Sequence, residues 1–447
     1  MKVLMISINR KAVFPVVPLG TGLASAIARR AGHEVHLLDL WWEADYKNAA
    51  EKALNAFQPQ VVGISIRNTG EITSRDQPDS YIDYIRNVVQ QCRAFSSEPQ
   101  VILGGYGFSC APEAFLLHCG ANIGIIGEAE IALPSLLDRV QKQLSLENIP
   151  NVILRKNEDF IYGPRHRLEE LGNISWPAWD LYDQRYHQLE TTVPAMGIQT
   201  KRGCAFRCLD CDVPAVDSHY YRLRPVDKVV DELEQIKKDI DPKWIYFADN
   251  IFNDPPAYAD KLCREIIRRG IFIPWVTFAV PHRGNKDLYA LMKEADCLRL
   301  VYEIQSASTE MLPRWKKCFQ PQDILQAAEW SNEVGIQTFF LIQFGGPQET
   351  VETVRESIKV CEQLKYARVK IQIPRSGLKL GSIFDSPWAK NNPIHGGEFE
   401  AGDLSPEAEE LIEQYIENNK NVLLEKDDVI AGAQGTSLFE NYTWDKV

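Results

Sequence analysis

The 447-residue chain lacks any apolar run near the roughly 18 residues that a membrane-spanning helix needs. Its amino-terminal segment holds only a six-residue apolar run before Asn9, which is too short for the core of a signal peptide. An excess of positive charge is also lacking, because 49 Lys and Arg face 61 Asp and Glu, for a formal net charge of −12. A nucleic acid or an anionic membrane would favour a basic surface. The sequence therefore predicts a cytoplasmic protein with neither nucleic acid nor membrane as a partner.

Closely spaced cysteines are rare as well: of ten cysteines, seven lack the spacing of metal ligands. In a reducing cytoplasm such residues stay as thiols, and isolated cysteines in apolar contexts are usually small buried side chains. They also leave no second group that could hold an auxiliary cluster. We expect all seven to pack inside the protein: Cys92, Cys110, Cys119, Cys263, Cys297, Cys318 and Cys361.

Residues 1–150 alternate between apolar, strand-like runs and segments of helical period. The strand-like runs are KVLMISI, VHLLDL, VVGISI, QVILGG and IGIIG. Such strands, separated by helices, indicate a parallel sheet that is covered on both faces. We therefore predict an α/β protein that begins with a doubly wound, Rossmann-like domain. Its ligands should lie at the carboxyl ends of the strands.

A Pro-, Gly- and Trp-rich segment at 151–194 interrupts this alternation and is interpreted as a linker. A second series fills 195–375 and predicts a (β/α)6 partial barrel, whose chemistry belongs on the loops after the strands. Its helices are expected around 226–239, 256–269, 286–294, 321–334 and 350–364. Residues 376–447 form an irregular, α-rich tail, in which SPEAEELIEQYIENNKNVLLE predicts a helix opened by Ser405.

Three cysteines stand apart, because Cys204, Cys208 and Cys211 are spaced as C-x3-C-x2-C after the first strand of this barrel. A disulfide does not suit a reducing compartment and leaves one cysteine over. A structural zinc site needs four ligands, and His219 could be the fourth. A 4Fe–4S cluster normally has four thiolates, so three would leave one iron open to a small molecule. The residues alone thus leave a cluster and a zinc site as open interpretations.

In this position the motif resembles that of the radical SAM superfamily, specifically of members with an N-terminal cobalamin-binding domain. The resemblance continues in PLGTGLASAI, GHEVHLLD, LGGYG and GEAE, and in the barrel in FADNIF, YEIQSASTEML and FGGPQET. It implies that the three cysteines hold a 4Fe–4S cluster, that S-adenosylmethionine chelates the open iron, and that cobalamin is a further cofactor. It also implies an external one-electron reductant such as flavodoxin or ferredoxin.

The resemblance points to Ser65, Gly104 and Gly105 as cobalamin-binding residues, because small side chains are needed where the nucleotide tail passes the backbone. The family element that supplies a histidine ligand to cobalt is absent, so a bound cobalt should lack one. Two alternatives stay open. Gly20, Gly22 and Asp39 approximate a dinucleotide fingerprint, although they lie far from the first strand. A vestigial domain that binds nothing is the other.

Strand ends of the barrel supply candidate contacts to S-adenosylmethionine. Asp249 could accept hydrogen bonds from its amino group, with help from Asn250. Gln305 and Ser306 could reach its ribose hydroxyls or its carboxylate, and Gln343 should also face the barrel mouth.

Three positions depart from the family pattern. Asp210 stands where an aromatic residue usually covers the adenine, Gln305 replaces a glutamate, and Ala307 replaces a glycine. The carboxylate of Asp210 could instead accept from the adenine amino group. These departures leave open which carbon–sulfur bond of the sulfonium is oriented for cleavage.

The leading hypothesis is a cobalamin-dependent C-methyltransferase that reductively cleaves S-adenosylmethionine and acts on a small metabolite or peptide. A second hypothesis keeps the cluster without cobalamin, for dehydrogenation, deoxygenation, cyclisation or transfer of the 3-amino-3-carboxypropyl group. A third, a non-catalytic metal-stapled binding protein, is disfavoured because structural metal sites are normally coordinatively closed. The sequence singles out no catalytic residue.

Overall fold

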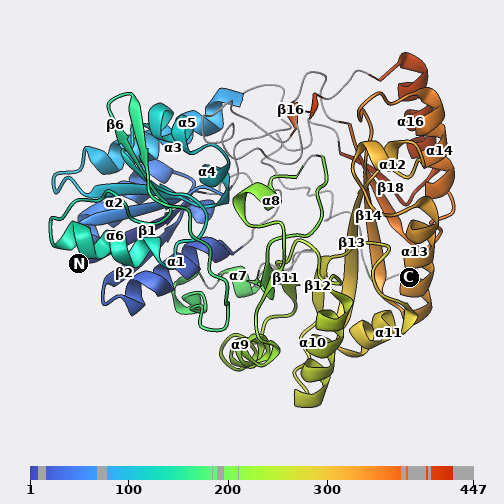
Figure 1. Cartoon of the computed structure of the whole chain (residues 1–447), viewed down its shortest axis with the longest axis horizontal. Helices are drawn as coiled ribbons and strands as arrows, with labels where there is room; N and C mark the ends of the chain where they lie inside the picture. Colours follow the sequence, from blue (N-terminus) through green and yellow to red (C-terminus); the bar gives the residue numbers. More distant parts are fainter. Residues whose placement is uncertain are drawn as a thin grey trace. The chain divides into compact units, whose positions relative to one another are not determined.

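The computed structural model describes residues 1–8, 17–67, 78–183, 185–188, 196–209, 211–373, 379–380, 399–400 and 404–425. The chain divides into two compact units, the first centred on Met1–Glu190 and the second on Ser218–Gly381 (Figure 1). No helix among the described residues is long and apolar enough to cross a membrane.

The first unit is built on a seven-stranded sheet of order β2-β1-β3-β4-β5-β6-β7. Its parallel part comprises β1 (Lys2–Ser7), β2 (Glu34–Asp39), β3 (Val61–Ser65), β4 (Gln100–Gly104) and β5 (Ile123–Ile125). The helices of this unit are α1 (Leu19–Arg30), α2 (Tyr46–Phe57), α3 (Pro78–Arg93), α4 (Tyr106–Cys110), α5 (Pro112–Cys119) and α6 (Ala132–Gln141). The predicted doubly wound fold is confirmed, with its topological switch between β1 and β3.

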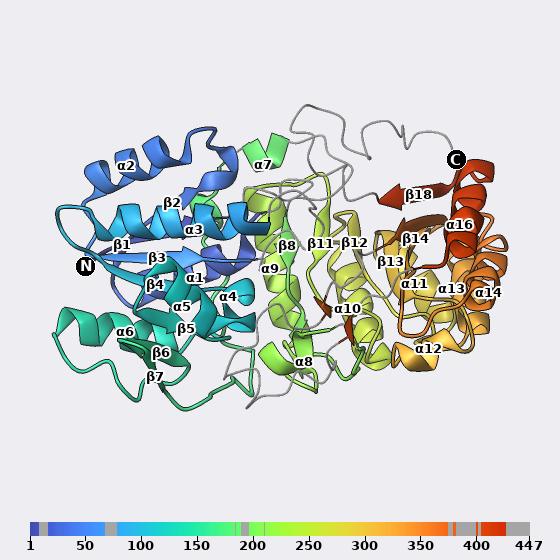
Figure 2. The same ribbon diagram turned by 90° about the horizontal axis from the view of Figure 1, so that it is seen from above.

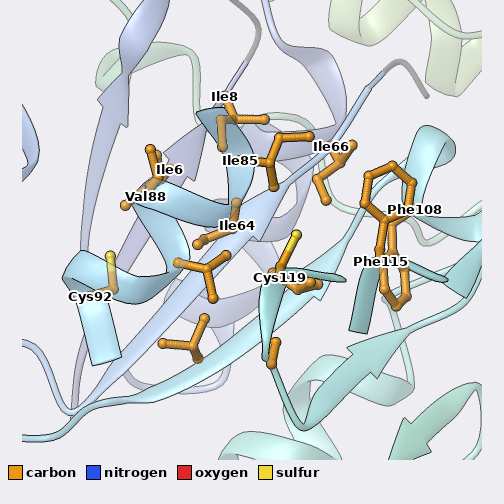
Figure 3. Close-up of a cluster of buried hydrophobic side chains, with 14 of the residues drawn as sticks. Ile6, Ile8, Ile64, Ile66, Ile85, Val88, Cys92, Phe108, Phe115 and Cys119 are labelled. Carbon is orange, nitrogen blue, oxygen red and sulfur yellow. The ribbon is translucent and has the colours of Figure 1, made fainter. Parts of the chain in front are cut away.

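Two hydrophobic cores cover the two faces of this sheet. Successive side chains of a strand point to opposite faces, so β1 sends Leu4 and Ile6 into one core and Val3 and Met5 into the other. Figure 3 shows the first of these cores, where strand residues such as Ile6 meet Ile85 of α3. Burial on both faces explains why the strands are apolar throughout rather than alternating.

The segment that was interpreted as a linker begins with two strands instead. β6 (Val152–Lys156) and β7 (Asp159–Tyr162) form an antiparallel hairpin that extends the first sheet beyond β5. Its turn contains Asn157 with a φ of 58°, a conformation that asparagine tolerates well. The strands are short and were hidden in the sequence by the irregular residues that follow them.

The second unit contains a parallel sheet of order β18-β15-β14-β13-β12-β11-β8. Its strands are β8 (Gly197–Ile198), β11 (Ile245–Phe247), β12 (Trp275–Phe278), β13 (Cys297–Gln305), β14 (Gln337–Gln343), β15 (Arg368–Gln372) and β18 (Val422–Glu425). Figure 2 shows β8, β11, β12, β13 and β14 following one another across the sheet. The helices are α9 (Val226–Asp239), α10 (Pro256–Arg269), α11 (Lys286–Glu294), α13 (Pro321–Val334) and α14 (Val351–Cys361), as the periodicity predicted.

The tail contributes a strand that the sequence did not predict. Helix α16 (Pro406–Asn418) begins after Ser405, whose side chain accepts a hydrogen bond from Ala408 N, as expected of an N-cap. The helix ends at Asn418, however, and residues 422–425 pair with β15 in parallel as β18. The partial barrel therefore has a seventh strand, drawn from outside the predicted six units.

Cysteine burial follows the expectation with two exceptions. Cys92, Cys119, Cys263, Cys297 and Cys361 are buried, and Cys110 is half-buried. Cys318 is exposed, so the expectation that it packs inside the protein is wrong. It lies on the irregular segment between β13 and α13, where no regular element covers it.

Candidate functional site

The cysteine loop, Gly203–Cys211, follows β8 at the carboxyl edge of the second sheet. A short antiparallel ribbon of β9 (Lys201–Arg202) and β10 (Arg222–Leu223) closes the segment that contains it. Within that segment, Cys204 N donates to Ser218 O at 3.1 Å. The segment that carries the cysteines thus begins and ends at the β9–β10 ribbon.

Gly203 permits the sharp departure of the chain just before the first cysteine. Its φ of +83° favours glycine, and an added Cβ would lie 2.1 Å from Ser218 Oγ and 2.2 Å from Tyr220 O. The glycine of RGC is therefore required by backbone packing, independently of any ligand.

All three motif cysteines lie on this one loop. Cys204 is buried, whereas Cys208 and Cys211 are half-buried. Burial raises the pKa of the Cys204 thiol, and Cys208 raises it further, which places the first two thiols within electrostatic reach of each other. Among the described residues, no group of three or more His, Cys, Asp or Glu side chains is arranged as a metal site.

Asp249, predicted to contact S-adenosylmethionine, is already engaged by the protein. The fully buried carboxylate accepts hydrogen bonds from Thr200 N at 2.8 Å, from the Thr200 hydroxyl and from Lys201 N at 3.3 Å. Burial raises its pKa, while the Lys201 ammonium opposes that shift. In this structure Asp249 fixes the chain between β8 and β9, a task that sequence patterns do not reveal.

Lys201 is the main site-forming residue that sequence reasoning missed. Its ammonium donates to the carbonyl oxygens of Phe252 and Asp254, both at 2.8 Å, although the residue is only 2% exposed. Three aromatic rings surround it, those of Tyr221, Phe252 and Tyr258, with centroids 5.4–5.7 Å from Nζ. Burial lowers the pKa of this ammonium.

Tyr221 joins these aromatic rings to Cys204, the first cysteine of the motif. Its hydroxyl lies 4.0 Å from Cys204 Sγ, while its ring faces the Lys201 ammonium. A buried positive charge thus stands one side chain away from the Cys204 thiol. Such a charge favours the thiolate form, which is the form that binds metal.

The base of the ribbon carries a second buried network. The Tyr258 hydroxyl lies 3.0 Å from Thr200 O and 2.8 Å from Arg224 O. Arg224 also pairs with Glu232 of α9 at 2.7 Å, with both side chains almost completely buried. Because truncating one partner of a buried ion pair is costly, this pair fixes the ribbon against α9.

Two further predicted residues lie near the cysteine loop in the sequence or in space. Asn250 is exposed, and its Nδ2 donates to Gly203 O at 3.4 Å, which brings it to the base of the loop. Asp210 lies outside the described residues.

Gln305 and Ser306 end β13 at the same edge of the sheet. Gln305 adopts a φ of 55° where the register between β13 and β14 shifts, so its side chain leaves the regular alternation of the strand. Ser306 is buried, lies 3.1 Å from Ser357 Oγ, and accepts from Ser308 N at 3.2 Å. Ser306 therefore holds its own loop against α14.

Gln343 ends β14 beside Gln372, its register partner on β15. Its Nε2 is buried and has no hydrogen-bond partner among the described residues. A buried donor without a partner is costly unless a ligand accepts its hydrogen bond. Of the predicted residues on the barrel, Gln343 is the one left with such a donor, which suits the carboxylate of an amino-acid moiety.

In the first unit, the structure brings the three predicted cobalamin residues together. Ser65 and Gly104 are direct register partners at the carboxyl ends of β3 and β4. A Cβ added to Gly104 would lie 3.8 Å from Ile125 O, in ordinary van der Waals contact, so packing within the unit does not require glycine here. Gly105 has a φ of +98°, and a Cβ there would lie 2.5 Å from Ile66 O, so this glycine is also required by the backbone.

Ser109 was not predicted from the sequence, yet it links two of the segments that resemble the family, LGGYG and GEAE. This buried serine of α4 donates to Gly105 O at 2.8 Å and accepts from Gly127 N at 2.8 Å. It therefore links the glycine turn after β4 to the GEAE corner after β5.

The dinucleotide alternative does not fit the structure. A Cβ on Gly22 would collide with the Tyr182 hydroxyl at 1.7 Å, so this glycine accommodates an aromatic ring rather than a phosphate. Asp39 is buried and accepts hydrogen bonds from Trp41 N at 3.2 Å and from the Tyr186 hydroxyl. Neither residue is available to a nucleotide.

Comparison with known families identifies both parts of the chain. Residues 198–361 match the family model of the radical SAM superfamily. The chain thus contains a radical SAM domain, and the cysteine loop lies within it. Residues 6–137 match the model of the B12 binding domain. The protein is therefore, more particularly, a radical SAM enzyme with an N-terminal B12-binding domain, as the resemblance indicated.

Several curated proteins are similar over most of this chain. An uncharacterized methyltransferase of Pyrococcus horikoshii is 25% identical over 367 residues, which cover 81% of this chain and 77% of that protein. Tryptophan 2-C-methyltransferase of Streptomyces laurentii is 23% identical over 77% of this chain and 67% of its own length. Hopanoid C-3 methylase of Methylococcus capsulatus is 24% identical over 73% of this chain and 60% of its own length.

Solved structures support the same fold. The radical S-adenosylmethionine methyltransferase TsrM of Kitasatospora setae, with cobalamin and a 4Fe–4S cluster bound, aligns with a TM-score of 0.79. The alignment covers 95% of this chain and 93% of that one at 21% identity. The cobalamin-dependent radical enzyme OxsB aligns with a TM-score of 0.68 and covers 93% of this chain and 61% of its own, at 16% identity.

The two domains imply a 4Fe–4S cluster, S-adenosylmethionine and cobalamin, and the residues fit these groups. Three thiols on one loop are the donor set of a cluster with an open iron. Gln343 has a buried donor that suits S-adenosylmethionine, and the small residues Ser65 and Gly104 adjoin at the strand ends, which suits cobalamin. The zinc interpretation, with the exposed His219, finds no support in the family matches.

If the three motif thiols are the cluster ligands, replacing Cys204, Cys208 or Cys211 by Ala should abolish the brown absorbance of anaerobically reconstituted protein and lower its iron content. The matched control is Cys318→Ala, since Cys318 lies outside the motif. The control should keep the cluster. Full iron content in any of the three motif variants would contradict the assignment.

Replacing Lys201 by Met should destabilise the second unit by about 3 kcal/mol or more, because two buried carbonyl oxygens lose their donor. Denaturant unfolding followed by tryptophan fluorescence measures the effect. Lys228→Met, at an exposed position of α9, should stay within about 0.5 kcal/mol of the wild type. Equal denaturation midpoints for the two variants would show that the buried contacts of Lys201 contribute little to stability.

Replacing Ser65 by Phe should reduce cobalamin uptake at least tenfold, because the ring would occupy the carboxyl end of β3. Bound cobalamin is measured by absorbance after gel filtration. Ser145→Phe makes the same change at an exposed serine and should bind normally. Gly105 is a poorer test position, since its variants would disturb the backbone even without ligand. Unchanged uptake by Ser65→Phe would remove Ser65 from the site.

Proposed function

We propose that this protein is a cobalamin-dependent radical SAM methyltransferase that adds a methyl group to a carbon atom of a small organic substrate. The observation that carries the proposal is the presence, in one chain, of the three-cysteine loop and of a B12-binding fold whose Ser65 and Gly104 adjoin at the strand ends. Methyl transfer is also what three of the similar curated proteins are named for, which supports this reaction over other radical chemistry.

When bound, the cluster, S-adenosylmethionine and cobalamin supply the electron, the radical precursor and the methyl carrier of such a reaction. The protein's own residues bind and orient them. The thiols of Cys204, Cys208 and Cys211 hold the cluster, and Lys201 and Asp249 fix the loop that carries them. Gln343 donates to the bound S-adenosylmethionine, and Asn250 stands at the base of the loop to assist.

Gln305 and Ser306 differ in their suitability for this pocket. Ser306 is engaged with Ser357, so its part in binding is indirect, through the shape of its loop. Gln305, turned out of the strand by its positive φ, remains a candidate for the ribose or the carboxylate. We retain Asp210 as a candidate beside the adenine on the resemblance alone.

The substrate class is a small molecule or peptide, in keeping with the acidic chain. The names of the relatives include tryptophan, a hopanoid and a cytidylyl phosphonate, which share no common chemistry. The substrate therefore has to be found by experiment. We further propose that the enzyme is cytoplasmic and takes its electron from flavodoxin or ferredoxin.

Product analysis tests the proposed reaction. The reconstituted enzyme is incubated anaerobically with cobalamin, S-adenosylmethionine labelled in its methyl group, a strong reductant and candidate substrates, beginning with tryptophan. S-Adenosylhomocysteine and 5′-deoxyadenosine should both form, and both should disappear in Cys208→Ala. Omission of cobalamin is the matched control for methyl transfer.

Other products would indicate a different reaction. 5′-Deoxyadenosine alone, at a rate independent of cobalamin, would replace methyl transfer by dehydrogenation, deoxygenation or cyclisation. Methylthioadenosine would indicate transfer of the 3-amino-3-carboxypropyl group. Absence of all three nucleosides from a fully loaded enzyme would overturn the proposal.

A further inference from the structure

The first cysteine of the motif has hydrogen-bonding neighbours to which the proposed function assigns no task. Cys204 is only 6% exposed, so water has little access to its sulfur. Phe206 N donates a hydrogen bond to that sulfur from within the loop. The hydroxyl oxygen of Tyr221 lies 4.0 Å from Sγ and belongs to a different part of the chain. The contact with Tyr221 therefore depends on how the fold brings the two segments together.

The β9–β10 ribbon places Tyr221 beside this thiol. Arg202 and Arg222 are register partners in the ribbon. Tyr221, one residue before that pair, thus stands across from Gly203, one residue after it. The tyrosine is therefore held at the point where the chain enters the cysteine loop.

Lys201 fixes the ring of Tyr221 from one side. Its ammonium lies 5.5 Å from the centre of that ring, and an ammonium is attracted to an aromatic face. The ammonium is itself held by Phe252 O and Asp254 O, both at 2.8 Å. The ring thus has a fixed partner, while its hydroxyl reaches the thiol.

Ligation decides which atom donates in the contact between Tyr221 and Cys204. A cysteine that binds a metal group is a thiolate, which has no proton and can only accept a hydrogen bond. The ordinary pKa of a tyrosine hydroxyl is about 10, so the hydroxyl keeps its proton at neutral pH. Tyr221 is therefore the donor whenever Cys204 is a ligand.

The charged side chains near this contact come in opposite pairs. The Asp254 carboxylate also interacts with the Tyr221 hydroxyl, but it is paired with Arg283, whose Nε lies 3.2 Å from Oδ1. The Lys201 ammonium likewise acts on the Asp249 carboxylate. Because each pair is neutral as a whole, the hydroxyl can be removed without changing the balance of charge around the thiol.

We propose that Tyr221 is a positioning residue that acts through Cys204: its hydroxyl donates to the Cys204 sulfur and thereby raises the reduction potential of the bound 4Fe–4S cluster. Hydrogen bonds to the sulfurs, net charge and solvent exposure set the potential of such clusters. Reduction by one electron adds a negative charge, and a donated hydrogen bond stabilises that charge most where water is excluded. The inference rests on the cluster-binding part of the proposed function and is independent of methyl transfer.

The test measures the midpoint potential of the cluster in anaerobically reconstituted protein, with neither S-adenosylmethionine nor cobalamin present. Dithionite is oxidised to sulfite, the cluster gains one electron through mediator dyes, and electron paramagnetic resonance reports the reduced fraction. Tyr221→Phe keeps the ring that faces Lys201 and removes only the hydroxyl. At a given ambient potential its equilibrium constant for reduction should be about threefold to tenfold lower, which places the midpoint ~30–60 mV lower.

Tyr258→Phe is the matched control. The Tyr258 ring lies 5.4 Å from the same ammonium, but its hydroxyl lies against Thr200 O at 3.0 Å and Arg224 O at 2.8 Å. Loss of this hydroxyl disturbs the same group of rings without removing a contact to a cysteine. Its midpoint potential should therefore equal that of the wild type. The iron content of each variant shows whether the cluster is loaded.

Three results would overturn the inference. A midpoint for Tyr221→Phe equal to or above that of the wild type would show that the hydroxyl does not favour reduction. Equal lowering in Tyr221→Phe and Tyr258→Phe would mean that packing of the rings matters rather than the contact with Cys204. Poor iron uptake by Tyr221→Phe would mean that the hydroxyl serves cluster assembly instead. A wild-type protein without any reducible cluster would be a different result, because it would defeat the proposed function itself.

Discussion

Burial of the Lys201 ammonium beside the Asp249 carboxylate sets the geometry of the whole candidate site. The ammonium is held by two carbonyl oxygens of the β11–α10 connection, and the carboxylate by the backbone on either side of Thr200. Neither group could be left without hydrogen bonds at this depth, since an isolated buried ion costs several kcal/mol. The two strands they connect, β8 and β11, are thereby fixed at the point from which the cysteine loop departs.

The two units place functional residues by one common rule. In each, parallel strands deliver small or polar residues to a single edge: Ser65 and Gly104 in the first sheet, Gln343 and the cysteine loop in the second. The edges differ in their residues. The first carries Gly104, which has no side chain, and the second carries Gln305, whose positive φ takes it out of the regular strand.

Sequence reasoning recovered the elements of the fold well, because their periodicity is set by burial. Helices α9, α10, α11 and α13 have the bounds that the pattern of apolar residues predicted. It missed β18, since NVLLE continues the composition of the preceding helix and only its pairing with β15 makes it a strand. Long-range pairing of this kind leaves no local signal.

At the site, the three cysteines could be predicted from the sequence, because ligands of one metal group on one loop need a fixed spacing. Asp249 and Ser306 were recognised as important, but their hydrogen bonds to Thr200 and Ser357 lead to the protein itself. Lys201 gave no signal, because a lysine before RGC is expected to be solvated. Cys318 was taken for core, since its exposure depends on an irregular segment whose path cannot be read from composition.

The late position of β18 in the chain has a consequence for synthesis. β15 is complete at Gln372, yet its outer edge is covered only when residues 422–425 pair with it. While the ribosome makes the intervening residues, the second sheet presents a row of unsatisfied backbone groups, which are a template for unwanted strand pairing. The sheet therefore stays incomplete until β18 has been synthesised. Before then, the nascent chain is most prone to wrong strand pairing at the edge of β15.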